Sequence, residues 1–369
     1  MKRIGRLIFS GAGILGLVFC SRAPSKSLSL SPGFVFSLRE EVRLEYDGET
    51  SGGLQAAGGN IYFSTKKGTV YAVDGAAKKI AWQFAAKAAV LAAPSVCSER
   101  IVFADKENNI YCLGLDGTLR WKKKFEESVS GGIVQDSGKA FLIMNEVNLV
   151  VLDAAHGNEV WRFKAASAIR TSPVFWNRQI ICATAEGKLH FLPPPGQSIS
   201  TYKSGAAVAG PLFIDQNRLY FSQEDGTFQC LELTAKKNLW KIKTGGFLTS
   251  LPAVDEKRIF LRTSNHVLFC LRKKSGILDW WRSLSWPAPY SPTVGDGLVF
   301  IAALSPVLTA FKKETGERAG TYDAGNVLQS APLCLGGCLV ISTFNLETSK
   351  GALVFLKGRA PEEGDSKKK

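Results

Sequence analysis

The chain has 369 residues, of which 45% are hydrophobic and 21% are charged, a balance that excludes wholesale disorder and allows a sizeable core. The formal net charge of +14 favours anionic partners, such as lipid headgroups, anionic envelope polymers or an acidic protein face. With 36 glycines, 15 prolines and only two methionines, the composition indicates many turns and argues against a helical protein.

Residues 1–20 have the order of charge and hydrophobicity that is typical of an export signal. Three basic residues precede an apolar run from Leu7 to Phe19, which is shorter than the ~20 residues that a spanning helix needs. Cys20 follows this run and resembles the lipidated cysteine of a bacterial lipoprotein, although Phe19 stands where a small residue is the rule. An ordinary signal or an uncleaved anchor with an incidental cysteine are the alternatives. We therefore expect export, with a lipid anchor at Cys20.

Short alternating strands recur along the next three hundred residues. Their third members stand at positions 72, 112, 151, 191, 230, 270, 310 and 355, with separations of 40, 39, 40, 39, 40, 40 and 45. A strand led by proline opens most copies, and about ten residues after the third member comes a strand marked by Trp82, Trp121, Trp161, Trp240 and Trp280. Tyr202 and Tyr322 are expected to take the tryptophan's place in two further copies. Each copy therefore predicts four short antiparallel strands, the content of a propeller blade.

The two ends of the repeat are complementary. The last copy has no tryptophan strand, whereas residues 42–46 precede the first copy as a fourth strand precedes every other copy. The sequence thus predicts an all-β fold, an eight-bladed β-propeller of four-stranded antiparallel blades over residues 42–357. Its ring is expected to be closed by an N-terminal strand that completes the last blade. Residues 21–41 are interpreted as a tether and lead-in, and residues 358–369 as a charged flexible tail.

The chemistry-bearing residues fit structural roles. Cys112, Cys230 and Cys270 share one repeat position, and equivalent positions in packed sheets lie ~10 Å apart, beyond the ~7 Å that a disulfide spans. Cys334 and Cys338 flank a Gly-Gly turn, which would place them on opposite faces of a hairpin. The three histidines lack the spacing of a zinc site, and no paired nucleophile and base is found. We predict no catalytic residue, no metal and no cofactor.

The repeat resembles the PQQ-like (quinoprotein-type) propeller family. The similarity lies in the string Gly68–Asp74 with Trp82 following, and in the string Val151–Trp161. Among exported proteins of this size, the chain most resembles the BamB family of lipid-anchored, eight-bladed scaffolds in the outer-membrane β-barrel assembly machinery. The resemblance implies a non-catalytic scaffold at the periplasmic face of the outer membrane or in the cell envelope. It would act as a monomer within a complex, bind proteins of that machinery and bind no nucleic acid.

Two other functions stay open. Lysine runs at 122–124, 236–237 and 273–274 fall in or beside the turns between third and fourth strands, where they would gather on one face. Such a face would suit an envelope module that binds an anionic polymer or a lipid surface. Quinone-dependent dehydrogenases resemble the same repeat, so a degenerate quinoprotein is the other possibility. Those enzymes typically add a vicinal cysteine pair and long loops, neither of which this sequence contains.

An apolar surface is the remaining candidate for function. Trp286 and Tyr290 lie in the connection between the sixth and seventh blades, and Leu304 and Pro306 in a turn between second and third strands. These two kinds of loop lie on the same face of a propeller. The four residues are therefore a candidate partner-docking surface. The alternative is that both loops fold over their own blade.

Overall fold

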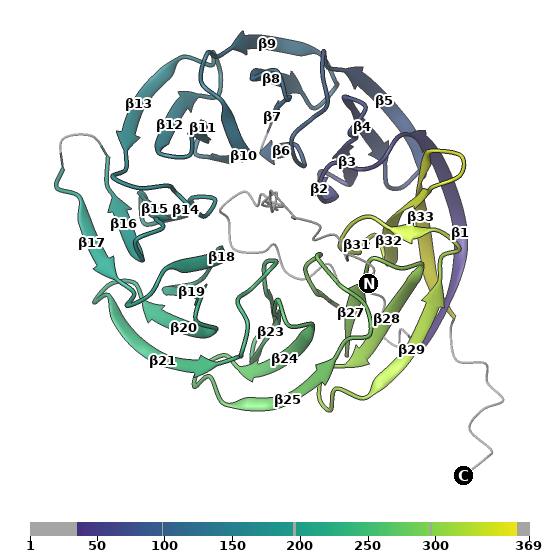
Figure 1. Ribbon diagram of the computed structural model, residues 1–369. Coiled ribbons are helices and arrows are strands. Elements are labelled where there is room, and N and C mark those ends of the chain that lie inside the picture. Colours follow the sequence, from purple (N-terminus) through teal and green to yellow (C-terminus); the bar gives the residue numbers. More distant parts are fainter. Residues whose placement is uncertain (1–34, 98, 195–196, 296, 360–369) are drawn as a thin grey trace, which may run out of the picture.

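The computed structural model describes residues 35–97, 99–194, 197–295 and 297–359, and it contains eight sheets arranged radially around an axis (Figure 1). Seven sheets have four antiparallel strands in chain order, the first strand innermost. Blade 1 comprises β2 (Gln55–Ala57), β3 (Asn60–Ser64), β4 (Thr69–Asp74) and β5 (Lys79–Ala85), and blade 2 comprises β6 (Ser95–Cys97), β7 (Arg100–Ala104), β8 (Asn109–Gly114) and β9 (Leu119–Lys124). Blade 3 comprises β10 (Val129–Asp136), β11 (Lys139–Met144), β12 (Asn148–Asp153) and β13 (Glu159–Lys164), and blade 4 comprises β14 (Val174–Trp176), β15 (Gln179–Ala183), β16 (Lys188–Leu192) and β17 (Ser200–Lys203).

The next three blades repeat this plan, and the eighth is built from both ends of the chain. Blade 5 comprises β18 (Val208–Asp215), β19 (Arg218–Gln223), β20 (Thr227–Glu232) and β21 (Lys237–Lys243), and blade 6 comprises β22 (Ala253–Val254), β23 (Arg258–Arg262), β24 (Val267–Arg272) and β25 (Leu278–Ser283). Blade 7 comprises β26 (Thr293–Val294), β27 (Leu298–Ala302), β28 (Val307–Lys312) and β29 (Arg318–Asp323). Blade 8 comprises β30 (Val327–Leu328), β31 (Leu333–Leu335), β32 (Cys338–Asn345), β33 (Lys350–Arg359) and β1 (Val35–Asp47). The predicted eight-bladed propeller is confirmed.

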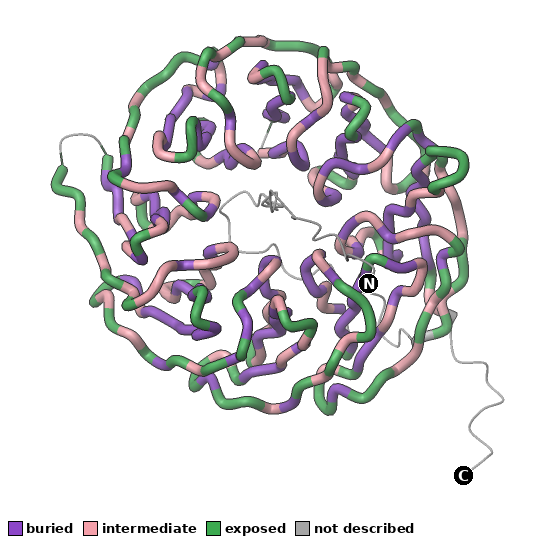
Figure 2. The backbone as a smooth tube through the Cα atoms, in the orientation of Figure 1, coloured by how far each residue is buried: buried purple, intermediate pink, exposed green. Residues whose placement is uncertain are grey.

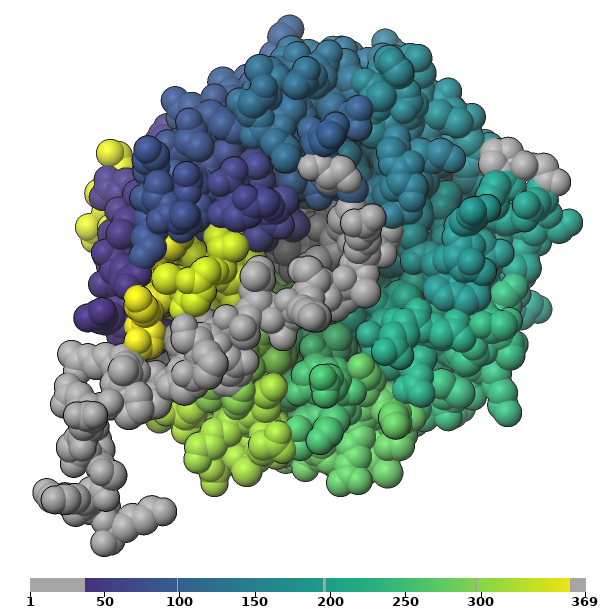
Figure 3. All heavy atoms as spheres, turned by 180° about the vertical axis from the view of Figure 1, so that it is seen from behind, coloured from purple at the N-terminus to yellow at the C-terminus, as the bar shows by residue number. Residues whose placement is uncertain are grey.

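The N-terminal strand closes the ring, as predicted. β1 pairs antiparallel with β33, from Val35 opposite Arg359 to Asp47 opposite Lys350. The purple start and the yellow end of the described chain therefore lie side by side on the rim (Figures 1 and 3). The strand begins at Val35 rather than at residue 42, because its pairing with β33 continues through a charged stretch that has no alternating apolar pattern.

β1 also joins the two blades beside it. Tyr46 packs against Phe63 of blade 1, with ring centroids 4.7 Å apart. Glu41 forms an ion pair with Lys78 in the β4–β5 turn of blade 1. On the other side, the hydroxyl of Tyr322 in blade 7 donates to Glu40 at 3.4 Å. The closing strand is thus held by both neighbouring blades as well as by β33 of its own blade.

The cores lie between the blades. Eight clusters of buried side chains occur, each drawn from two adjacent blades, so that every blade-to-blade contact has its own core. The middle strands are buried on both faces, as in β4, and the outermost strands alternate between exposed and half-buried residues, as in β5 (Figure 2). No blade could bury its apolar faces alone.

A tryptophan contact recurs at four of these junctions. Each indole Nε1 donates to a carbonyl in the β-turn of the next blade, always 33 residues along the chain: Trp82 to Leu115 at 2.9 Å, Trp121 to Ala154 at 3.0 Å, Trp240 to Lys273 at 3.3 Å and Trp280 to Lys313 at 2.9 Å. The ring covers a glycine of that turn so closely that an added Cβ would lie 2.5–2.8 Å from it, at Gly117, Gly157, Gly276 and Gly316. Trp161 keeps the register, opposite Val151, and packs beside Phe163.

The structure explains the small residue of the repeat and corrects one detail. Cys112, Cys230 and Cys270 are buried directly opposite Trp121, Trp240 and Trp280 on the neighbouring strand, as expected of core positions. The expectation for the two tyrosines is wrong by two residues. Tyr202 pairs with Leu189 and Tyr322 with Leu308, whereas the tryptophan's place opposite Ala310 is taken by Gly320.

Removing the closing strand should destabilise the whole ring. A variant beginning at Gly48 exposes the edge of β33 and loses Tyr46, whose truncation alone would cost about 3–5 kcal/mol. We expect a much lower unfolding temperature by circular dichroism than for a control beginning at Val35. Equal unfolding temperatures for the two variants would show that β1 does not close the fold.

The turn glycines provide a sharper test of the tryptophan contact. Gly316 and Gly297 are both in blade 7 and have φ of 67° and 69°, but only Gly316 faces a ring, because nothing lies within 4 Å of a Cβ at Gly297. Gly297→Ala should cost about 1 kcal/mol in backbone strain. Gly316→Ala should cost a further ~1–3 kcal/mol from overlap with Trp280. Denaturant unfolding of both variants measures the difference, and equal losses would contradict the contact.

Candidate docking surface

One hydrogen bond repeats around a single face of the disc. In seven blades the turn between second and third strands donates a backbone N–H to the connection that enters the blade, at 2.8–2.9 Å. The pairs are Lys66 to Glu49, Lys106 to Ala89, Asn145 to Ser128, Ala185 to Ala168, Glu224 to Ala207, Ser264 to Phe247 and Leu304 to Pro287. The two kinds of loop are therefore joined, and this face is defined by them.

The structure places three of the four predicted docking residues at this face with differing exposure. Trp286 and Leu304 are 56% and 46% exposed, and the bond from Leu304 N–H to Pro287 brings their loops together. Pro306 is half-buried, and its carbonyl accepts the N–H of Ala324 at 2.9 Å.

The prediction that Tyr290 is a docking residue is wrong. Its ring is 8% exposed and packs into the core between blades 7 and 8 beside Phe300 and Leu328. Its hydroxyl donates to the carbonyl of Leu328 at 3.1 Å, and burial raises the pKa of the phenol. Tyr290 follows an Ala-Pro step that turns the chain inward, so it holds its loop down instead of meeting solvent.

Phe247 belongs to the same surface and was missed by the sequence reasoning. It is 38% exposed, in the connection from blade 5 to blade 6, and its carbonyl accepts the N–H of Ser264. The signal was present in the sequence, because Phe247 follows a Gly-Gly pair where the other connections have small or charged residues. We call Phe247, Trp286, Pro287 and Leu304 the blade 6–7 patch.

The patch lies in the part of the face that carries no charge. The loops of blades 6 and 7 on this face, residues 244–248, 263–266, 284–290 and 303–306, contain no Asp, Glu, Lys or Arg. Every other blade has at least one charged residue in the equivalent loops. These include Glu49, Lys66 and Lys67 in blade 1; Lys87, Lys106 and Glu107 in blade 2; Glu126, Glu127 and Glu146 in blade 3; Glu186 in blade 4; Glu224 and Asp225 in blade 5; and Glu347 in blade 8. Apolar exposure without charge is typical of the centre of a protein-binding surface.

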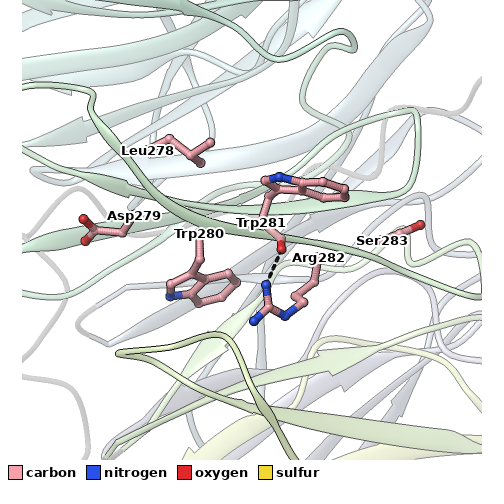
Figure 4. A pocket seen from close by; sticks show the side chains of 6 residues that line it. All are labelled: Leu278, Asp279, Trp280, Trp281, Arg282 and Ser283. Carbon is pink, nitrogen blue, oxygen red and sulfur yellow. Dashed lines mark hydrogen bonds between the residues drawn. The ribbon is translucent and has the colours of Figure 1, made fainter.

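A shallow hollow of about 560 Å³ lies elsewhere, along the outermost strand of blade 6. It is lined by residues 278–283 of β25, where Trp281 points outward and Arg282 lies beside Trp280 (Figure 4). The Arg282 guanidinium is 5.8 Å from the Trp280 ring and donates to Thr315 of blade 7 at 2.8 Å. The one carboxylate of the lining, Asp279, is paired with two arginines. These groups are engaged in holding blade 7 to blade 6.

The lysine runs do not form the cationic face that the sequence suggested. Lys122, Lys123 and Lys124 lie within β9 on the rim of the disc rather than in a turn. Lys273 is nearly buried, because its Nζ pairs with Asp215 of the preceding blade at 2.9 Å. Lys236 is drawn over the ring of Phe191, 4.5 Å from its centroid. Part of the basic excess is therefore used between blades.

The other titratable groups show local pairings. The imidazole of His156 bonds the Asp153 carboxylate at 2.6 Å and lowers its pKa, and burial lowers the pKa of His190. Burial raises the thiol pKa of Cys112 to about 11 and of Cys270 to about 12. Among the described residues, no three His, Cys, Asp or Glu side chains gather as a metal site would require, and no helix could cross a membrane. The predicted signal, Cys20 and most of the predicted tail lie outside these residues.

The chain is similar to known proteins in both sequence and structure. A sequence profile of the family described as outer membrane protein assembly factor BamB matches residues 37–114, 106–194, 187–289 and 237–360, which together span the whole propeller. The chain belongs to the BamB family. It is 21% identical over 328 residues to the outer membrane protein assembly factor BamB of Moranella endobia (strain PCIT), covering 88% of this chain and 76% of the relative. The corresponding protein of Yersinia pestis is 22% identical over 272 residues, 67% of this chain and 58% of its own length.

Solved structures agree with the propeller fold of the BamB family. BamB from Moraxella catarrhalis superposes with a TM-score of 0.72 at 14% identity, covering 88% of this chain and 99% of that one. A europium-containing methanol dehydrogenase superposes with a TM-score of 0.69 at 11% identity, covering 87% and 93%. At such low identity, both likenesses establish the fold alone.

Substitutions at this surface should separate exposed residues from structural ones. Trp286→Ala is expected to change the free energy of unfolding by no more than about 0.5 kcal/mol, because more than half of the side chain is already in water. Tyr290→Ala should cost about 3–5 kcal/mol by emptying a core site. Denaturant unfolding of each variant provides the measurement. A large loss at Trp286 would show that its loop packs onto its own blade.

Proposed function

We propose that this protein is a non-catalytic scaffold of the cell envelope that takes part in outer-membrane protein assembly. The observation that carries the proposal is its membership in a family described as an outer membrane protein assembly factor, matched from residue 37 to residue 360. In the proposal the chain is exported, held at the periplasmic face by a lipid on Cys20, and works as a monomer within a complex.

The blade 6–7 patch is the proposed contact with the complex. Its aromatic and aliphatic side chains are exposed on turns that are joined to one another by backbone hydrogen bonds. Exposed apolar surface is stabilised when a partner covers it, and tryptophan is a residue type that often dominates binding energy. The occupant that suits it is a protein component of the β-barrel assembly machinery that presents a largely apolar surface of its own.

The two alternatives draw less support from the molecule. A module for anionic polymers needs accessible cations, and Lys273 and Lys313 are instead paired with Asp215 and Asp255 between blades, with side chains less than a fifth exposed. A degenerate quinoprotein rests on a fold likeness at 11% identity. The scaffold reading accounts for both the family and the uncharged patch.

Co-purification tests the proposal. The full chain, tagged and expressed in its own host, should retain β-barrel assembly proteins after extraction in mild detergent, quantified by mass spectrometry. Trp286→Ala with Leu304→Ala should reduce that yield about ten-fold or more, since two central apolar contacts of about 1 kcal/mol each are removed.

The matched control is Leu119→Ala with Val160→Ala. These residues are 49% and 52% exposed on the rims of blades 2 and 3, away from the patch, and the yield should not change. Absence of assembly proteins from the parent preparation would overturn the scaffold function. An equal loss in both double variants would overturn the role of the patch.

A further inference from the structure

Arg262 departs from the repeat that surrounds it. It ends β23 opposite Leu268, and the residues in that register in the seven other blades are small or apolar and never charged. They are Ser64, Ala104, Ile143, Ala183, Ser222, Ala302 and Ser342. The chain itself thus provides seven controls, which show that the blade architecture does not need an arginine here.

The charge of Arg262 is buried and poorly compensated. The residue is 3% exposed, its Nη2 donates to the hydroxyl of Thr249, and its Nε has no hydrogen-bond partner. Among the described residues, no carboxylate lies within ion-pair distance of it. Desolvation lowers the pKa of the guanidinium to about 10, which still leaves it charged at neutral pH. Burying such a charge without an anion costs stability, so its presence needs a reason.

The strand register places Arg262 on the side of β23 that faces blade 7. Arg262 lies on the same face of β23 as Phe260, which packs between blades 6 and 7 in one cluster with Ala288 and Ala303 from the two patch loops. In blade 1 the equivalent Ser64 hydroxyl reaches across to the carbonyl of Ala92 in the next blade at 2.9 Å. The equivalent direction from Arg262 leads to the segment that enters blade 7.

Unused polar atoms accompany it there. The hydroxyl of Ser250, which is next to Thr249, donates to the carbonyl of Tyr290 at 3.3 Å. The residue after Tyr290 is Ser291, whose buried hydroxyl has no hydrogen-bond partner. The Nε of Arg262 and the hydroxyl of Ser291, from the two blades, are thus both buried without a hydrogen-bond partner. Both are hydrogen-bond donors for an anion.

We propose that Arg262 is the receptor for a carboxylate that a partner polypeptide brings to the blade 6–7 patch. The inference rests on the proposed function and adds the chemistry of the partner, an acidic side chain flanked by apolar ones. A carboxylate would bind side-on to Nε and Nη2, the fork geometry that arginine offers and lysine lacks. Because the patch itself has no charge, an acidic group there meets no competing cation, and low water content strengthens the pair. The loop of Trp286 and Pro287 would have to lift to admit it.

The direct test is a titration of the full chain with two peptides, acetyl-Leu-Asp-Leu-amide and acetyl-Leu-Asn-Leu-amide. The readout is the ¹⁵N–¹H resonance of the Arg262 Nε, assigned by its loss in Arg262→Lys. The aspartate peptide should shift this resonance saturably, with the asparagine peptide about ten-fold weaker or more. If neither peptide moves the resonance, or both move it equally, Arg262 is not a carboxylate receptor.

Stability provides an independent test. Arg262→Met removes an unpaired buried charge at similar volume, so it should raise the unfolding temperature while co-purification of assembly proteins falls. A fall in unfolding temperature as large as that of Tyr290→Ala would mean that Arg262 is structural, and the proposal would be lost. Assembly proteins retained equally by the parent and Arg262→Met would overturn the receptor and leave the scaffold function standing. Assembly proteins missing from the parent would overturn the scaffold function, while the peptide titration still decides on Arg262.

Discussion

The contact between a tryptophan ring and the glycine of the following blade's turn is the constraint on which this molecule depends. A four-stranded sheet of this size is too thin to keep its apolar faces from water, and each face becomes a core only when the next sheet lies against it. The indole fixes the distance between neighbouring blades in two ways: it fills the space above a glycine, and it donates a hydrogen bond to the same turn. This contact occurs at four junctions, and the stacking of the blades gives eight separate interface cores instead of one central core.

The periodic features were predictable from the sequence because they are consequences of that contact. The tryptophans, the small residues opposite them and the incomplete ends of the repeat all predicted the ring and its closure. Periodicity could not locate the start of β1, because Leu38, Arg39 and Glu40 pair through their backbones, without an alternating apolar pattern. It also gave Tyr202 and Tyr322 the tryptophan's place, whereas they lie opposite Leu189 and Leu308, two residues further along the outer strand.

The functional surface was only partly predictable, for a related reason. A loop residue has no partner spacing that reveals whether it faces water, so Trp286 and Tyr290 look alike in the sequence although one is exposed and the other bonds Leu328 from within the core. The lysine runs misled in the same way, because the aspartate that binds Lys273 comes from the preceding blade. In a repeat protein, the informative residues are those that break the register: Arg262 by its charge, and the loops of blades 6 and 7 by their lack of it.

The sharing of the eighth blade between the two ends has a consequence for the order in which this protein can fold. A chain that emerges N-terminus first presents β1 early, but the strand it pairs with, β33, arrives about three hundred residues later. Until then, β1 has no hydrogen-bonding partner and blades 1 and 7 each have one uncovered face. Contacts of such long sequence separation form slowly. The ring would therefore close only after the whole chain has emerged, and a chain of this design would benefit from chaperones that cover its unpaired edges until then.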